Sequence, residues 1–437
     1  MRTPTVRLAT TSAAVALLLT ACSSGSEPAT GGDGDWSFPE TDPTATIQVL
    51  GHQDSDELQP VFDAFSEAHP DITVQYEAVP FDELNSVLDA RIGNQDGNPD
   101  VFWADQPRIP ALAARGYTED ITEQFSEFTD VFDPAPLQSS SYEDSLWAMP
   151  IANSTQLLYY NKELVESAGD ELPSAAVEDR MTWAETTERA QAAVDAGATN
   201  GLLFGQTHRY YQLEPLPVSL GGSVGATGEG NLTPDITSQA WVDSMEWYQS
   251  IFADGISPLG VPPEQSNAEF LTGNTAYIVQ GPWLLPELED ATFEWGVAPH
   301  PYFEGGEAAT PTGSWSLAMS PFSDEKEAAA VFMHWMSVEG GGGYANNMAA
   351  PELPATPEGK VAYFERDVFA SDSGQDAVAI IDFESSNTAV PRVQTVGFVE
   401  FEEILGRAYS DVANGTDPAQ ALEAASAELE TAWAKYQ

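Results

Sequence analysis

The chain has 437 residues, with 15 Lys and Arg against 69 Asp and Glu, so its formal net charge at pH 7 is −54. This balance excludes nucleic acid as a default partner and argues against docking on an anionic membrane through a basic patch, because both need clustered cations. Hydrophobic residues make up 42% of the chain, which is enough for the cores of two or three domains. One cysteine excludes a disulfide framework and a Cys-based zinc cluster, and with five histidines we expect neither a metal site nor a cofactor.

The first 21 residues have the pattern of a secretory signal peptide. Arg2 and Arg7 precede a short apolar run, 13–19, that is too short for a permanent membrane span. The sequence Leu-Thr-Ala-Cys at 19–22 resembles a bacterial lipobox, so we expect Cys22 to become a lipidated N-terminus on the extracellular side of the cell membrane. An ordinary secretory cleavage site with an incidental cysteine is the alternative. Residues 22–44, rich in Ser, Gly, Pro, Thr and acids, are expected to form a flexible tether.

From Ala45 onward, strand and helix patterns alternate. The order strand, helix, strand, helix predicts a largely parallel sheet with helices on both faces. Four glycines at 340–343 interrupt the pattern, and no internal repeat is present. The predicted strands are 46–50, 71–76, 100–103, 146–151, 276–279, 293–297 and 316–319, and the predicted helices are 56–68, 82–92, 110–115, 163–168, 182–196, 238–253, 324–336, 398–413 and 417–436.

Five stretches of the chain carry a family resemblance through their order and spacing. They include the runs Gly-Asn-Pro-Asp (97–100), Leu-Tyr-Tyr-Asn-Lys (158–162) and Gly-Pro-Trp (281–283). The full stretches are 46–76, 97–117, 146–169, 275–288 and 312–336. Together they resemble the extracellular solute-binding proteins of sugar ABC transporters, the family of maltose-binding protein. The resemblance covers residues 45–437 and is weakest over 343–395.

The resemblance implies an α/β, two-lobed periplasmic-binding-protein-like fold, with interleaved lobes joined by hinge crossovers. By analogy, 45–150 plus 316–338 form lobe 1, 155–311 plus 343–437 form lobe 2, and the glycine run is the third crossing. The ligand would lie between the lobes, near the carboxyl ends of strands, and hinge closure would trap it.

The implied function is binding rather than catalysis. A lipid-anchored receptor of this family, expected to be a monomer, would capture a mono- or oligosaccharide and deliver it to the membrane permease of an ABC transporter.

Sugar binding needs flat aromatic surfaces together with planar polar groups. Trp103, Trp283 and Trp315 lie in the resembling stretches, after a strand or beside Gly or Pro, and this position favours the cleft over core packing, which is the alternative for each. The polar candidates lie at strand ends, loops and crossovers that the resemblance brings to the cleft. For Arg392 a structural ion pair is the alternative. The polar candidates are His52, Gln53, Asp54, Asp105, Gln106, Asn153, Tyr210, Ser314 and Arg392.

Two other functions stay open at this stage. A secreted glycoside hydrolase would use a carboxylate pair, and 69 acids make chance pairs inevitable. The same binding fold with a cationic ligand, such as a polyamine, would use the negative charge, although hydration of evenly spread acids explains that charge more simply. The Gly-x-Ser-x-Gly match at 221–225 is not a nucleophile elbow, because 225–234 cannot supply the helix that must follow.

Overall fold

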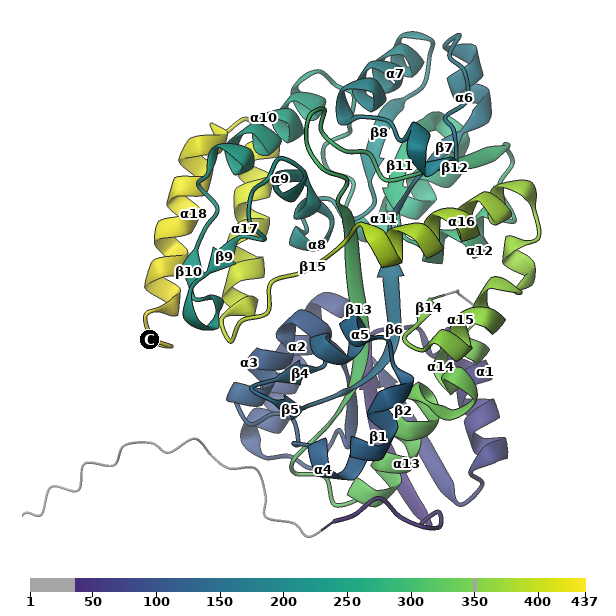
Figure 1. Ribbon diagram of the computed structural model, residues 1–437, viewed down its shortest axis with the longest axis vertical. Coiled ribbons are helices and arrows are strands. Elements are labelled where there is room, and N and C mark those ends of the chain that lie inside the picture. Colours follow the sequence, from purple (N-terminus) through teal and green to yellow (C-terminus); the bar gives the residue numbers. More distant parts are fainter. Residues whose placement is uncertain (1–35, 349–351) are drawn as a thin grey trace, which may run out of the picture.

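The computed structural model describes residues 36–348 and 352–437, and the predictions for the signal peptide, for Cys22 and for the tether up to residue 35 fall outside these ranges. The remaining part of the predicted tether, 36–44, is not free: Trp36 and Phe38 pack against the lobe 1 core, and Asp42 lies 2.8 Å from His69. Two separate sheets, each with its own hydrophobic core, divide the chain into two lobes (Figure 1). Within the described ranges, no helix has the length and the apolar character needed to cross a membrane.

The lobe 1 sheet has the strand order β14-β6-β13-β3-β1-β2, with β15 paired to β13. Strand β1 pairs in parallel with β2 and β3, as predicted, but β13 runs antiparallel to both β3 and β6. The sheet is therefore mixed rather than largely parallel, because β13 returns from lobe 2 and enters from the opposite direction. The strands are β1 (Ala45–Gly51), β2 (Ile72–Ala78), β3 (Val101–Asp105), β6 (Met149–Thr155), β13 (Thr310–Met319), β14 (Leu353–Pro354) and β15 (Ala389–Pro391).

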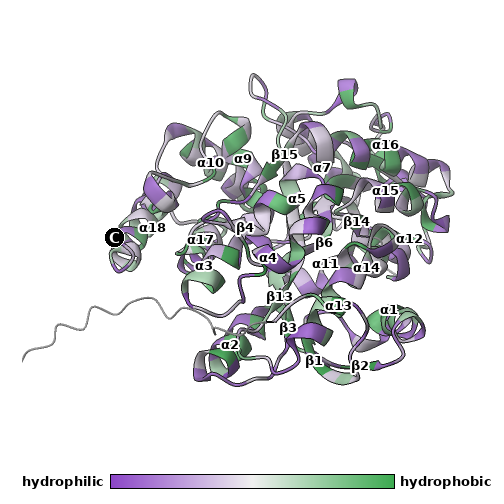
Figure 2. Cartoon of the chain, turned by 60° about the horizontal axis from the view of Figure 1, so that its bottom comes forward, coloured by the Kyte–Doolittle hydropathy of each residue, from purple (hydrophilic) through white to green (hydrophobic). Residues whose placement is uncertain are grey.

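Helix α1 (Ser55–Ala68) illustrates why the predicted helices form. The Asp54 carboxylate accepts a hydrogen bond from the Asp56 backbone at the helix start, and Leu58, Val61 and Phe65 are buried at helical spacing. Hydrophobic and hydrophilic residues both occur on α1 in Figure 2, as an amphipathic helix requires. The other lobe 1 helices are α2 (Phe81–Arg91), α3 (Ile109–Ala114), α4 (Thr122–Phe125), α5 (Pro134–Ser139), α13 (Lys326–Ser337) and α14 (Gly343–Asn347), beside the hairpin β4 (Ser141–Tyr142) and β5 (Ser145–Leu146).

Lobe 2 is built on a four-stranded sheet with the order β12-β7-β11-β8. Helix α7 (Trp183–Asp195) begins at a capping box in which Thr182 and Glu185 satisfy each other's backbone N–H groups. The strands are β7 (Leu157–Asn161), β8 (Asn200–Phe204), β11 (Thr275–Gln280) and β12 (Trp295–Ala298), and the small pair is β9 (Ala226–Thr227) and β10 (Thr233–Pro234). The other helices are α6 (Lys162–Ser167), α8 (Tyr210–Leu213), α9 (Pro215–Ser219), α10 (Gln239–Ala253), α11 (Pro263–Glu269), α12 (Leu285–Leu288), α16 (Asp372–Asn387), α17 (Phe398–Ala413) and α18 (Pro418–Trp433).

Strands β6 and β13 run between the two lobes side by side (Figure 1). The third crossing does not lie at the glycine run, where the sequence placed it. Tyr344 and Met348, which follow the glycines, pack in the lobe 1 core, and a Cβ on Gly341 would lie 2.5 Å from the Gly359 nitrogen. The run is thus a tightly packed turn inside lobe 1. The chain reaches lobe 2 through α15 (Pro357–Phe364), whose Tyr363 packs against lobe 2 residues.

Candidate functional site

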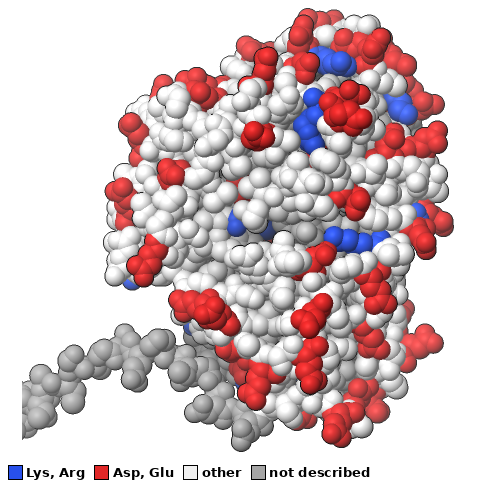
Figure 3. Space-filling view, in the orientation of Figure 1, with Lys and Arg blue, Asp and Glu red and all other residues white. Residues whose placement is uncertain are grey.

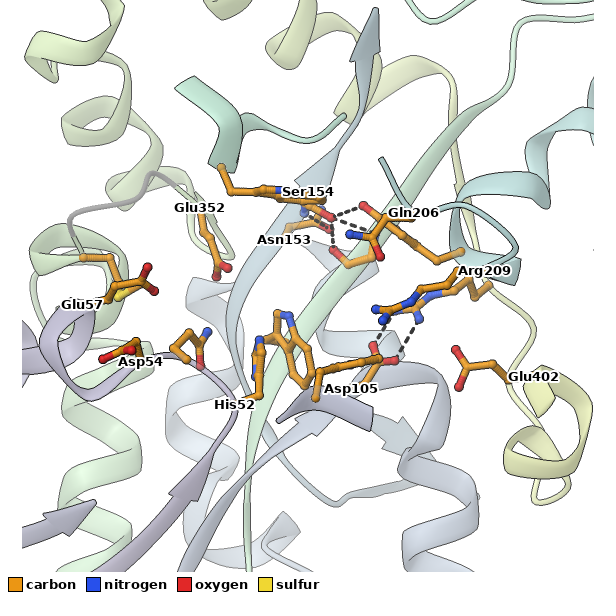
Figure 4. A pocket seen from close by; sticks show the side chains of 18 of the residues that line it. His52, Asp54, Glu57, Asp105, Asn153, Ser154, Gln206, Arg209, Glu352 and Glu402 are labelled. Carbon is orange, nitrogen blue, oxygen red and sulfur yellow. Dashed lines mark hydrogen bonds and ion pairs between the residues drawn. The ribbon is translucent and has the colours of Figure 1, made fainter. Parts of the chain in front are cut away.

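A cavity of about 420 Å³ lies between the lobes, and 19 residues line it. Figure 4 shows side chains pointing into it from strands and loops of both lobes. The lining residues are His52, Gln53, Asp54, Glu57, Phe81, Asp105, Asn153, Ser154, Gln206, Arg209, Tyr211, Trp283, Glu287, Gly313, Trp315, Met348, Glu352, Arg392 and Glu402.

An aromatic surface forms one wall of the cavity. The imidazole of His52 stacks on Trp315, with ring centroids 4.1 Å apart and planes 24° apart. Phe81 meets both rings edge-on, at 5.9 Å from His52 and 5.8 Å from Trp315. Burial, helped by the positive charge of Arg209, lowers the pKa of His52 to about 3, so the imidazole is neutral near pH 7. The wall therefore offers flat, uncharged rings.

Trp283 adds a second indole from lobe 2, on the short turn Pro282–Leu284 that follows β11. A Cβ on Gly281 would lie 2.0 Å from Cζ3 of Trp283, so the indole can fold back over the backbone only because residue 281 is glycine. The Gly-Pro-Trp run is thus the local reason why this half-buried ring sits at the cavity.

A chain of buried charges connects the lobes at one end of the cavity. Arg392 of lobe 2 donates to both carboxylate oxygens of Asp105 in lobe 1, at 2.8 and 2.5 Å, and the two side chains are 7% and 5% exposed. Arg108 of lobe 1 pairs with Glu402 on α17 and lies 3.9 Å from Asp105. Burial alone would lower the pKa of Arg392, but the adjacent carboxylates outweigh it and hold that pKa above its ordinary value.

Uncharged polar groups lie beside this charge network. The hydroxyls of Ser154 and Tyr211 are 2.7 Å apart, and Ser154 donates to the Gly313 carbonyl at 2.9 Å. The guanidinium of Arg392 lies 5.0 Å from the centre of the Tyr211 ring. A Cβ on Gly313 would be 2.7 Å from Tyr211, so glycine at this position lets Tyr211 lie against β13.

The opposite end of the cavity holds carboxylates without basic partners among the described residues. Gln53 donates to the Tyr344 hydroxyl at 2.7 Å, and that hydroxyl donates to Glu352 at 2.8 Å. Burial raises the pKa of Glu352 to about 7. Glu57 is more exposed, but its partial burial raises its pKa, and the charges of Asp54 and Glu287 raise it further. In the described part of the chain, no three His, Cys, Asp or Glu residues are grouped to hold a metal ion.

The structure brings most of the sequence-predicted residues to this one cavity. Those that line it are His52, Gln53, Asp54, Asp105, Asn153, Trp283, Trp315 and Arg392. The ion-pair alternative for Arg392 is also observed, since this residue both lines the cavity and pairs with Asp105. Ser314 lies in β13, where its backbone is paired with Asn153 of β6, and the structure does not describe its side chain.

Three predicted residues do not line the cavity. Trp103 is fully buried in the lobe 1 core against Tyr76 and Tyr344, because it lies within β3 rather than past its end. Tyr210 is also fully buried, in the lobe 2 core, and the next residue, Tyr211, is the one that reaches the cavity. Gln106 is 3% exposed and donates to the Ser316 hydroxyl at 3.3 Å.

Several lining residues were missed by the sequence reasoning. Arg209 was detectable, since basic residues are rare in this chain and it directly precedes Tyr210, which was already a candidate. The remaining missed residues are mostly acids or common polar residues, which carry no local signal in a chain with 69 acids. They are Glu57, Phe81, Ser154, Gln206, Tyr211, Glu287, Gly313, Met348, Glu352 and Glu402.

Known proteins of the same type share both the sequence pattern and the architecture. Maltodextrin-binding protein MdxE of Bacillus subtilis is 26% identical over 349 residues, which are 78% of each chain. The galactooligosaccharide-binding protein of the same organism is 26% identical over 62% of this chain and 64% of its own. Two solved structures share the two-lobed fold, which confirms the predicted fold class. These are an ABC substrate-binding protein of Listeria monocytogenes in complex with cycloalternan (TM-score 0.77, 22% identity, 89% of this chain and 99% of that one) and the GacH receptor of Streptomyces glaucescens (TM-score 0.76, 23% identity, 91% and 100%).

The family match itself extends over most of both lobes. Residues 51–342 match the family described as bacterial extracellular solute-binding protein, and this range runs from the end of β1 through the two crossing strands into the glycine run. Because the matched range exceeds half of the chain, the protein is a member of the bacterial extracellular solute-binding protein family.

Proposed function

We propose that the protein captures a carbohydrate between its lobes and presents it to the membrane permease of an ABC transporter. The observation that carries this proposal is the neutral aromatic wall of His52, Trp315 and Phe81, which lies in the same interlobe cavity as Trp283. A sugar ring has an apolar C–H face that packs on such rings, and hydroxyls that need both donors and acceptors.

The polar lining supplies both kinds of group. Arg392 and Arg209 donate only, the carboxylates accept only, and Ser154, Gln206 and Tyr211 do both. The relatives support the same ligand class, since their names describe maltodextrin and galactooligosaccharide binding. Capture without hydrolysis is the function that we infer, because the family consists of binding proteins.

Anchoring through a lipid on Cys22 is part of the proposal and rests on the Leu-Thr-Ala-Cys sequence at 19–22. Because Trp36 and Phe38 already pack on lobe 1, the proposed tether is the segment from Cys22 to residue 35. As a flexible coil of about 14 residues it would reach roughly 20 Å, which would keep the folded lobes near a membrane partner. One of the relatives, from Streptococcus pneumoniae, is described as a maltooligosaccharide ABC transporter solute-binding lipoprotein.

A thermal-shift screen over mono- and oligosaccharides, followed by titration calorimetry, tests the proposal, since a bound ligand raises the melting temperature by mass action. Trp315→Ala should weaken binding about tenfold to a hundredfold in the folded protein, which corresponds to about 1–3 kcal/mol. Trp247→Ala is the control, because Trp247 lies on α10 away from the cavity. Wild-type affinity in both Trp315→Ala and Trp283→Ala would reject the site, and breakdown of the captured sugar during incubation would favour a hydrolase.

A further inference from the structure

Four carboxylates lie together at one end of the interlobe cavity, and we call them the acidic end: Asp54, Glu57, Glu287 and Glu352. None of the four forms an ion pair within the described residues. Their hydrogen bonds come from neutral donors: the Asp56 backbone to Asp54, the Tyr344 hydroxyl to Glu352, and the Asn267 amide to Glu287.

The two arginines that line the cavity form ion pairs with acids outside the acidic end. Arg392 is held by Asp105, and Arg209 pairs with Asp82 and Glu264 at 3.2 and 3.1 Å. Figure 4 shows Asp54, Glu57 and Glu352 on one side of His52, and Arg209, Asp105 and Glu402 on the other. His52 between the two groups carries no charge near neutral pH. The acidic end therefore lies apart from the paired charges, with no cation of its own among the described residues.

The acidic end differs from the rest of the acidic surface, because its carboxylates come from both lobes and lie near one another. Figure 3 shows Asp and Glu scattered over the visible face of the molecule rather than gathered in one patch. At the cavity, by contrast, carboxylates of both lobes face each other: Asp54 and Glu57 from the start of α1, and Glu287 from α12. Closing the lobes on a neutral ligand would bring like charges together without compensation.

A second feature of the same end calls for a donor. Gln53 is 8% exposed and lines the cavity beside Asp54. Its amide nitrogen already donates to Tyr344, whereas its Oε1 atom accepts no hydrogen bond from the described residues. A buried acceptor without a donor is costly, so a ligand group that fits here donates hydrogen bonds. An ammonium group has only donors and carries the charge that the carboxylates lack.

We propose that the carbohydrate captured by this protein carries a protonated amine, which binds at the acidic end between Glu57, Glu287 and Gln53 while a sugar ring packs on Trp315. This inference rests on the proposed function and specifies its substrate class. The amine would cancel the repulsion between α1 and α12, so that its binding energy favours the closed arrangement of the lobes.

Matched pairs of sugars test the inference by titration calorimetry at pH 7. Each pair consists of a neutral sugar and its amine: glucose and glucosamine, galactose and galactosamine, cellobiose and the glucosamine dimer, and maltotriose and its reductively aminated form. The dissociation constant of the amine should be at least about tenfold lower than that of its neutral partner, because one charge-assisted hydrogen bond contributes free energy on this scale. Added salt should reduce the preference, because the carboxylates of Asp54, Glu57 and Glu287 are exposed to solvent.

Charge-neutral variants locate the amine. Glu57→Gln and Glu287→Gln should each lose most of the preference, whereas Glu67→Gln on the same α1 and Glu289→Gln just after α12 should keep it, because neither control lines the cavity. Neutral sugars that bind as tightly as their amines would overturn the inference and leave the proposed function intact. Spermidine that binds more tightly than every sugar would also overturn it. Binding of no sugar, neutral or aminated, would overturn both proposals.

Discussion

The ion pair between Asp105 and Arg392 joins the two lobes, and its removal gives the sharpest prediction. Asp105→Asn keeps the shape of the side chain but removes the charge that faces Arg392, which is only 7% exposed. The nearest other acid of the network, Glu402, is already engaged by Arg108. The variant would therefore leave a buried guanidinium without its carboxylate partner.

Loss of one partner of a buried ion pair commonly costs about 3–5 kcal/mol. Here the protein can avoid this cost without unfolding, because separation of the lobes would let Arg392 reach water while each lobe keeps its own core. Most of the cost should then appear in the balance between closed and open forms. A shift of about 3 kcal/mol corresponds to a change of about a hundredfold in that balance, and the apparent affinity for a ligand that binds the closed form falls by up to the same factor.

Small-angle scattering and titration calorimetry together measure this shift. Asp105→Asn should have a larger radius of gyration than the wild type without ligand and should bind sugar more weakly, with little change in the free energy of unfolding. Asp89→Asn is the matched control, because its pair with Arg115 is exposed and lies within lobe 1. An unchanged radius of gyration and affinity, combined with a loss of about 3–5 kcal/mol in unfolding free energy, would refute the reasoning. The ion pair would then stabilise the folded state as a whole and would not control the balance between open and closed forms.

Three further predictions test other parts of the molecule. Cys22→Ala should release the protein from the membrane fraction, and a variant that resists high-salt washing would contradict the lipid anchor. Trp103→Ala should lower the free energy of unfolding by about 3–5 kcal/mol, measured by denaturant titration, while the folded protein keeps its sugar affinity, because Trp103 is a core residue. The third concerns Glu352, whose pKa rises from 4.5 to about 7 on folding. The folded state therefore binds more protons than the unfolded chain between these values, and wild-type stability should fall relative to Glu352→Gln by up to about 3 kcal/mol as the pH rises from 4.5 to 7. Parallel pH profiles of the two proteins would disprove that assignment.

The sequence predicted the helices and strands well where local pattern and tertiary packing agree. The helix at 398–413 has the predicted bounds, because its apolar residues recur at helical spacing and bury one face in lobe 2. The glycine run shows the opposite case. Its composition resembles a hinge, but the close approach of Gly341 to Gly359, far along the chain, makes it a packed turn. Only the tertiary structure contains that contact.

The candidate site was predictable to the extent that residues follow strand ends. His52, Asp105 and Trp315 reach the cavity for that reason, since β1 and β3 end at its edge and β13 passes it. Trp103, like Trp315, is a tryptophan in a stretch that resembles the family, but it lies two residues before the end of β3 and packs against Tyr76 and Tyr344. Tyr210 and Tyr211 differ by one position on a short helix, and sequence alone does not tell which of the two rings turns inward. Of the acidic end only Asp54 was predicted, because the other three carboxylates come from α1, α12 and the segment before β14, which no local pattern connects.

Strand β13 both lines the cavity and connects the two lobes. Its early residues, Thr310 to Thr312, pair with β15, which leads into lobe 2, and its late residues pair with β3 in lobe 1. Gly313 and Trp315, where the two sets of pairs meet, line the cavity, and the pairing with β6 shifts register directly after Trp315. These cavity-lining residues and residues that connect the lobes therefore belong to one continuous strand. If the proposed sugar packs on Trp315 and the lobes rotate about the crossing strands, the ligand would act directly on the segment that bends, with no relay of side chains between the cavity and the hinge.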